Sequence, residues 1–285
     1  MKKTSLKKYL LFVSKAAVTG LLIWLVFTKV NFVELQQHFN SIKGITIVYV
    51  LALLCVQSLL AGIRWRIVMA LFDRVLSLAL TVRIYFEGMF FNQALPSTVG
   101  GDGIRIYRVF KLGLPFGAAF NGVLLDRVAG FISLIILVAL AQPILFQKIQ
   151  EQQALMAFWL ITAFGLFAII TLLAMGSLPS KLGRWRAIRG LVQLSLGARQ
   201  LLKTPSRSLP VLGYSLFGHL LMVSAAFLIA VDIGINVSII DCIIILPSVM
   251  LVATIPISIG GWGLREGAMV TAFGLLGAPA AEVAA

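Results

Sequence analysis

Two copies of a glycine-rich motif that ends in arginine are the part of this 285-residue chain best suited to bind a charged ligand. The first copy reads P-S-T-V-G-G-D-G-I-R over residues 96–105, and the second reads P-I-S-I-G-G-W-G-L-R over residues 256–265. Five positions are identical, at a constant offset of 160 residues. Proline and paired glycines interrupt helices, so each copy is predicted to be a break in the backbone. Such a repeat indicates internal duplication.

The two breaks have the composition of an anion site. Unpaired N–H groups at the start of a half-helix attract anions, and an arginine adds a forked donor that suits phosphate. We therefore predict that the breaks hold one lipid head group between them, or two separately. The alternative is that the glycines allow tight packing while the arginines extend to the membrane interface. The residues assigned to the head-group site are Asn92, Gly100, Gly101, Asp102, Arg105, Gly260, Gly261 and Arg265.

Further ionisable residues accompany the breaks. Asp126 and Arg127 interrupt an apolar stretch, and Glu266 follows the second copy directly. Ionisable residues inside a membrane are costly and tend to be paired or functional. We expect Arg127 to pair with Asp102 or Glu266, and Asp126 to pair with Arg105, as parts of a gate. A purely structural ion pair is the alternative.

The composition indicates a membrane protein. The chain is 60% hydrophobic and 12% charged, which is far too apolar for a soluble domain of this length. Its net charge of +14 is no sign of nucleic-acid binding, because the basic residues lie between apolar runs, where membrane topology places them. The sequence shows no metal-binding or enzyme motif, so we assign no catalytic residue, metal or cofactor, and lean against an enzyme.

The elements that would position these residues are apolar segments. Those long enough to span a bilayer lie at about 9–28, 45–63, 117–142, 154–176 and 209–231. The span at 45–63 is expected to end at Arg64 and Arg66. Interrupted apolar segments at 76–95 and 238–255 lead into the two motif copies. Residues 181–203 read either as a basic amphipathic helix for the inner membrane surface or as an ordinary loop.

The distribution of lysine and arginine predicts the topology. Most basic residues fall at the N-terminus, within 64–111 and within 177–208, which places these regions in the cytoplasm. The spans at 45–63 and 209–231 then run in opposite directions, so units 45–142 and 205–285 are inverted repeats. In the competing interpretation, 238–257 simply crosses the membrane. By the same offset, the final span of the second unit would begin near 277, so we expect it to be missing from this sequence.

These features predict an all-α, polytopic integral membrane domain over 1–285, with inverted repeats and two re-entrant broken helices. Three motifs resemble the lysylphosphatidylglycerol synthase transmembrane family, also described as flippase-like: N-Q-A-L-P-S-T-V-G-G-D-G-I-R at 92–105, L-D-R-V-A-G at 125–130 and P-I-S-I-G-G-W-G-L-R-E-G at 256–267. The resemblance implies a lipid-handling protein of the bacterial inner membrane. The synthase members also carry a cytosolic aminoacyltransferase domain, for which this sequence has no corresponding segment.

The function expected from this resemblance is translocation of an anionic phospholipid or of a lipid-linked precursor such as a polyprenyl phosphate. Two alternatives stay open. The chain is the membrane region of a lysylphosphatidylglycerol synthase, which transfers lysine to phosphatidylglycerol, or it is a non-transporting partner of a lipid-modifying enzyme.

Overall fold

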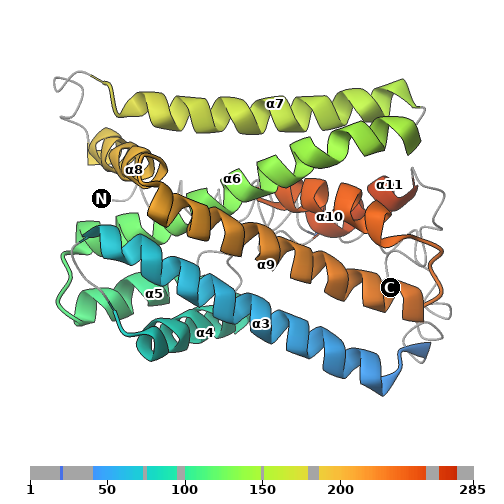
Figure 1. Cartoon of the computed structure of the whole chain (residues 1–285), viewed down its shortest axis with the longest axis horizontal. Coiled ribbons are helices and arrows are strands. Elements are labelled where there is room, and N and C mark those ends of the chain that lie inside the picture. Colours follow the sequence, from blue (N-terminus) through green and yellow to red (C-terminus); the bar gives the residue numbers. More distant parts are fainter. Residues whose placement is uncertain are drawn as a thin grey trace.

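The computed structural model describes residues 20–21, 41–72, 76–94, 100–148, 151–178, 186–254 and 263–274, and these residues form helices and no strand (Figure 1). The all-α expectation is therefore confirmed for this part of the chain. The expected span at 9–28 lies almost wholly outside it. The elements are α3 (Gly44–Met69), the short 3-10 helix η1 (Ala70–Phe72), α4 (Leu78–Ala94), α5 (Gly100–Lys111), α6 (Phe116–Lys148), α7 (Gln152–Met175), α8 (Arg186–Leu202), α9 (Pro205–Asp232), α10 (Ile239–Ala253) and α11 (Leu264–Gly274).

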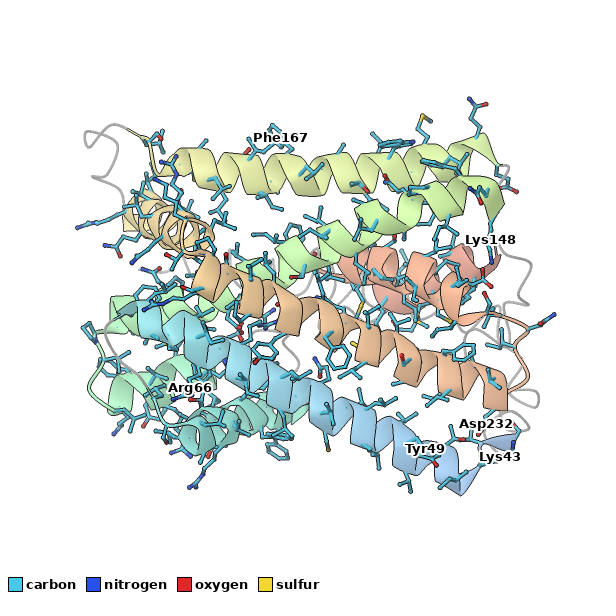
Figure 2. The ribbon with its side chains drawn as sticks, viewed as in Figure 1. Lys43, Tyr49, Arg66, Lys148, Phe167 and Asp232 are labelled. Carbon is cyan, nitrogen blue, oxygen red and sulfur yellow. The ribbon has the colours of Figure 1, made fainter. Side chains whose placement is uncertain are left out.

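Four of the described helical segments are long and apolar enough to cross a bilayer. They are Gly44–Phe72, Phe116–Lys148, Leu155–Met175 and Pro205–Asp232. Helix α7 leaves large apolar side chains such as Phe164, Phe167 and Ile170 exposed along one face, and Phe167 points away from the other helices in Figure 2. An apolar face of this size is stable against lipid, as expected of a multi-pass membrane protein.

Helix α3 is longer than the sequence predicted. The expected end at Arg64 and Arg66 is wrong, because the helix continues to Met69. Met69 is completely buried, so the last turn of α3 is held by packing. Arg66 Nε donates a hydrogen bond to the carbonyl of Leu76, 2.8 Å away, and Arg64 turns toward the protein interior. The apolar residues that follow the two arginines thus prolong the helix.

Helices α3 and α9 lie side by side and run in opposite directions (Figure 1). At one end the backbone N–H of Lys43 donates to Asp232 Oδ2 at 2.9 Å. At the other end Arg207 Nη1 donates to the carbonyl of Ala70 at 3.4 Å. These contacts join the start of each helix to the end of the other, as an inverted relationship requires.

The helix bounds follow the 160-residue offset. Shifting α3, α4 and α5 by that offset gives 204–229, 238–254 and 260–271, close to the observed bounds of α9, α10 and α11. Together with the opposite directions of α3 and α9, this agreement supports the proposal that the two units are inverted copies.

The two shorter helix pairs lie toward opposite ends of the molecule. In Figure 1, α4 and α5 pack near the C-terminal end of α3, whereas α10 and α11 lie toward the other end. Lys148 at the end of α6 pairs with Asp241 at the start of α10, with 2.6 Å between Nζ and Oδ1. Ser238 and Asp241 form a capping box that starts α10. This placement is compatible with hairpins that enter the membrane from opposite faces.

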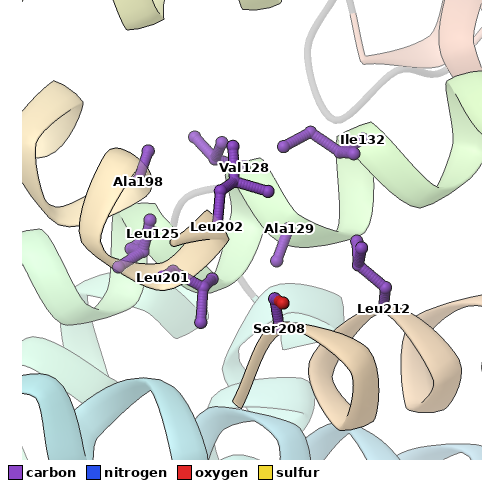
Figure 3. Close-up of a pocket in the computed structure, with 9 residues that line it drawn as sticks. All are labelled: Leu125, Val128, Ala129, Ile132, Ala198, Leu201, Leu202, Ser208 and Leu212. Carbon is purple, nitrogen blue, oxygen red and sulfur yellow. The ribbon is translucent and has the colours of Figure 1, made fainter. Parts of the chain in front are cut away.

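Helix α8 crosses the direction of the long helices and is seen almost end-on in Figure 1. It is fastened to the end of α7, since Ser195 Oγ accepts a hydrogen bond from the N–H of Gly176 and Arg199 Nε donates to the carbonyl of Leu173. Of the expected 181–203 helix, the described part is helical. A pocket of about 10 Å³, no larger than one water needs, lies between α6, α8 and α9 (Figure 3). Its mostly apolar lining includes Leu125, Leu201 and Leu212, so it is no head-group site.

Candidate anion-binding site

Five ionisable side chains from three helices meet in the protein interior, and we call this group the Arg105 cluster. Its members are Arg64 from α3, Asp102 and Arg105 from α5, and Asp126 and Arg127 from α6. Asp102, Arg105 and Asp126 are buried, with exposed fractions of 5%, 6% and 1%. Arg127 lies at the edge, with about half of its side chain exposed.

Asp126 is the centre of the cluster. Its Oδ1 accepts a hydrogen bond from Arg64 Nε at 2.7 Å, and its Oδ2 accepts one from Arg105 Nη2 at 2.8 Å. Both are short, charge-assisted bonds in a buried environment. The pairing of Asp126 with Arg105 expected from the sequence is present, and the same carboxylate ties α6 to both α3 and α5.

Asp102 holds the second carboxylate at the start of α5. Its Oδ2 accepts a hydrogen bond from Arg127 Nε, so this expected pairing is also present. Its Oδ1 lies 3.5 Å from Arg105 Nη1, which is a long contact. A negative charge in the first turn of a helix is favoured by the helix dipole, and this explains why the aspartate stands at this position.

The guanidinium of Arg105 contacts two aromatic rings. Its Cζ lies 4.2 Å from the ring centre of Trp65 and 4.7 Å from that of Tyr85. Such cation–π contacts stabilise the charge and orient the planar group. Two buried donors here, Arg105 Nε and Trp65 Nε1, have no hydrogen-bond partner among the described residues. Leaving a buried donor unpaired costs about 1–3 kcal/mol, so the site favours an added acceptor.

The cluster carries an excess positive charge. Its three guanidinium groups face two carboxylates, which leaves a net charge of +1 among these five residues. Glu87, Asp232, Asp241 and Glu266 are engaged with other basic residues of the described structure. Each of the three guanidinium groups contacts a carboxylate, and a ligand with one negative charge would neutralise the five-residue group as a whole. Among the described residues, no group of three or more potential metal ligands occurs.

The first glycine-rich break positions the cluster through close packing. A Cβ atom on Gly101 would lie 1.9 Å from the carbonyl oxygen of Gly88, so only glycine lets α4 and α5 approach so closely. The N–H of Gly101 donates to Asn92 Oδ1 at 2.8 Å. Asn92 and Gly101 thus satisfy each other at the start of α5, which Gly100 begins. This hydrogen bond and the close helix contact hold the start of α5, the helix that carries Arg105.

The arginine of the second motif copy forms a local ion pair. Arg265 is more than half exposed, and its Nη2 lies 2.8 Å from Oε1 of the adjacent Glu266. Glu266 Oε2 accepts a hydrogen bond from the N–H of Gly263, whose φ of +79° requires glycine. Among the described residues, no ion pair joins Arg265 or Glu266 to the cluster. Gly260 and Gly261 lie outside the described residues.

The sequence interpretation missed Arg64, Trp65 and Tyr85. Arg64 was taken as the end of a span, yet it binds Asp126 and also donates from Nη1 to Ser215 Oγ of α9 at 3.1 Å. The available signal was the apolar sequence on its C-terminal side, which prolongs α3 to Met69. An arginine with apolar sequence on both sides is a better candidate for an interior position than for a helix end.

A second, apolar cavity lies on another side of α6. It has a volume of about 320 Å³ and is bounded by α6, α7 and the end of α10. Apart from Thr254 it is lined by apolar side chains and a glycine: Phe131, Leu160, Ile161, Phe164, Gly165, Leu251 and Val252. This lining suits hydrocarbon and not a charged group.

Comparison with known families identifies the chain over nearly its whole length. The model of the lysylphosphatidylglycerol synthase TM region matches residues 12–285. Comparisons with curated proteins and with solved structures give no match. The matched region contains the Arg105 cluster, both motif copies and all four apolar spans of the described structure. The chain therefore belongs to the lysylphosphatidylglycerol synthase TM region family.

Proposed function

We propose that the protein binds the head group of an anionic membrane lipid at the Arg105 cluster and moves it between the two leaflets. The family connects the chain with lipid modification or transport. The observation that carries the proposal is the buried Arg105, whose Nε has no partner among the described residues and which belongs to a cluster with a net charge of +1. Phosphate matches such a donor set in both charge and geometry.

The arrangement of the helices supports movement as well as binding. Inverted repeats with broken helices are typical of transporters in which a site is exposed to each side in turn. Helices α3 and α9 are antiparallel, and the two shorter helix pairs lie toward opposite ends. Arg127, half exposed at the edge of the cluster, is placed to meet a head group before Arg105 does.

The charge distribution supports an orientation in a bacterial inner membrane. Arg66 lies at one end of the molecule, whereas Lys43, Lys148 and Asp232 lie at the other (Figure 2). The end with Arg66 is also that of α5, whose last turn holds Arg108 and Lys111. The positive-inside rule then makes that end cytoplasmic, together with the N-terminus. We propose an anionic phospholipid or a polyprenyl phosphate as the lipid, and an enzyme that modifies this lipid as the partner.

A leaflet assay tests the proposal. The full chain is reconstituted into vesicles with a fluorescent phosphatidylglycerol, and dithionite added outside reports how fast inner-leaflet lipid becomes accessible. We expect Arg105→Gln to slow the protein-dependent rate by about tenfold or more, because a charged buried hydrogen bond contributes about 1.5–3 kcal/mol. Arg108→Gln is the matched control, since Arg108 lies on the same helix but is exposed and paired with Glu87.

The alternatives predict different results. If the wild-type chain moves neither phosphatidylglycerol nor a polyprenyl phosphate, the proposal is wrong. A lysylated lipid formed by the purified chain would identify the membrane region of a synthase. A third result would identify a non-transporting partner. In that case neither the wild type nor Arg105→Gln transports lipid, and both stimulate a lipid-modifying enzyme equally.

A further inference from the structure

We infer that Asp126 is an internal counter-ion that occupies the place of the lipid anion and is displaced when the head group binds. This inference rests on the proposed function and adds an exchange step to it. A carboxylate and a phosphodiester both present two negatively charged oxygens to guanidinium donors. In the structure, the two oxygens of Asp126 each take one such donor, from Arg64 and from Arg105.

The hold of Asp126 on Arg105 is incomplete, and this leaves room for a competitor. Within the described part of the chain, the carboxylate contacts Nη2 of Arg105, Nε is buried without a partner, and Nη1 has only the long contact with Asp102. A bidentate anion at Arg105 engages two parallel N–H groups at once. The ligand therefore satisfies a donor that Asp126 leaves unpaired.

Asp126, and not Asp102, is placed to be exchanged. Asp102 lies on α5 together with Arg105, so it moves with that arginine, and it accepts a hydrogen bond from Arg127. Asp126 belongs to α6 and connects this helix to α3 and α5. Breaking its bond to Arg105 removes an ionic link between α5 and α6. Exchange thereby couples the binding of an anion to a weaker connection between α5 and α6, in which the Asp102–Arg127 pair remains.

Binding measurements on isosteric variants test the exchange. The probe is dioctanoyl phosphatidylglycerol, with dioctanoyl phosphatidylcholine as the zwitterionic control, and each is titrated against the purified full chain. We expect Asp126→Asn to bind the anionic probe on the order of tenfold more tightly than wild type, because a competing buried charge is gone. Asp102→Asn changes the cluster charge equally but leaves Asp126 between the arginines, so its gain is smaller.

The control variant is Asp241→Asn, an identical change on α10 whose partner is Lys148, and it should leave the affinity at the wild-type value. Equal or weaker probe binding by Asp126→Asn overturns the exchange, as does an equal gain in Asp102→Asn. If the wild type binds the anionic probe selectively but Asp126→Asn binds it no more tightly, the proposed head-group site is supported and the exchange of Asp126 is contradicted. If neither wild type nor Asp126→Asn prefers phosphatidylglycerol, the proposed function fails as well.

A measurement on the wild-type chain keeps the test decisive if Asp126→Asn does not fold. Hydrogen–deuterium exchange over residues 100–111 is compared with and without dioctanoyl phosphatidylglycerol. Displacement of Asp126 predicts faster exchange in this helix when the probe is bound, because α5 loses one of its two ionic links to α6 and keeps only the Asp102–Arg127 pair. Slower exchange in α5 on binding would mean that Asp126 stays in place, which contradicts the inference.

Discussion

The two helix pairs that follow the repeated motif differ in their chemistry. The pair α4–α5 contributes Asp102 and Arg105 to a buried ionic cluster, whereas α10 packs into an apolar core around Ile245 and Val249. The positions related by the 160-residue offset explain this difference. Arg64, Trp65, Tyr85 and Asp102 correspond to Ser224, Ala225, Ile245 and Trp262. The second copy keeps the glycines and the arginine but lacks the side chains that hold the first arginine inside.

The motif encodes a backbone geometry, and the residues that surround it in the structure determine its chemistry. Glycine is required in both copies for local reasons, namely the contact of Gly101 with Gly88 and the positive φ of Gly263. The arginine becomes an interior charge only where a carboxylate from another helix reaches it. In the described structure that carboxylate is Asp126, and it reaches Arg105 alone of the two motif arginines.

The largest expected effect comes from replacing each motif arginine in turn, which tests whether Arg105 and Arg265 differ in their contribution to stability. Arg105→Ala leaves Asp126 with one of its two partners, and breaking a buried ion pair typically costs about 3–5 kcal/mol. Arg265→Ala removes a half-exposed pair with an adjacent residue and should change stability by less than about 0.5 kcal/mol. Thermal unfolding of both variants in the same detergent checks this. Equal destabilisation would contradict the asymmetry between the copies.

A smaller effect is expected from the glycines of the first copy. Gly101→Ala forces a Cβ against the backbone of Gly88, and overpacking of this kind costs about 1–3 kcal/mol. Gly103→Ala, two residues along the same helix, meets nothing within 4 Å. It should stabilise α5 by up to about 1 kcal/mol, because alanine favours a helix. The two variants are compared by thermal unfolding and by lipid translocation. A tolerated Gly101→Ala would remove the packing explanation for this glycine.

The smallest expected effect sharpens the description of the second pair. Ser238→Ala removes the capping side chain at the start of α10, which should cost about 1 kcal/mol. Ser238 lies at the far end of α10 from its contact with the apolar cavity, and it touches no residue of the Arg105 cluster. We therefore expect a lower unfolding temperature with an unchanged affinity for anionic lipid. A loss of lipid selectivity in this variant would mean that the second pair shares the head-group site.

Part of the site followed from the sequence. Asp126 and Arg127 stand in an apolar stretch, and such residues must find partners of opposite charge. Asp102 and Arg105 were the nearest candidates, and both pairings occur. Arg64 was missed because an arginine that ends a span at the cytoplasmic surface and an arginine that faces the protein interior cannot be told apart from the sequence at the end of an apolar run. The identical motif gave no sign that Glu266 would accept the hydrogen bond from the N–H of Gly263 at the start of α11.

The sequence by itself determined the helical, membrane-spanning character of the chain and the need of its interior charges for partners. Both follow from transfer energies that depend on residue type and on near neighbours. The tertiary structure alone decided that Arg64 and Arg105 share one carboxylate and that Arg265 does not. This pairing depends on which faces of α3, α5 and α6 pack together. Local composition does not determine how distant segments pack. The resulting excess of one positive charge, on which the proposed lipid site depends, is therefore a property of the fold.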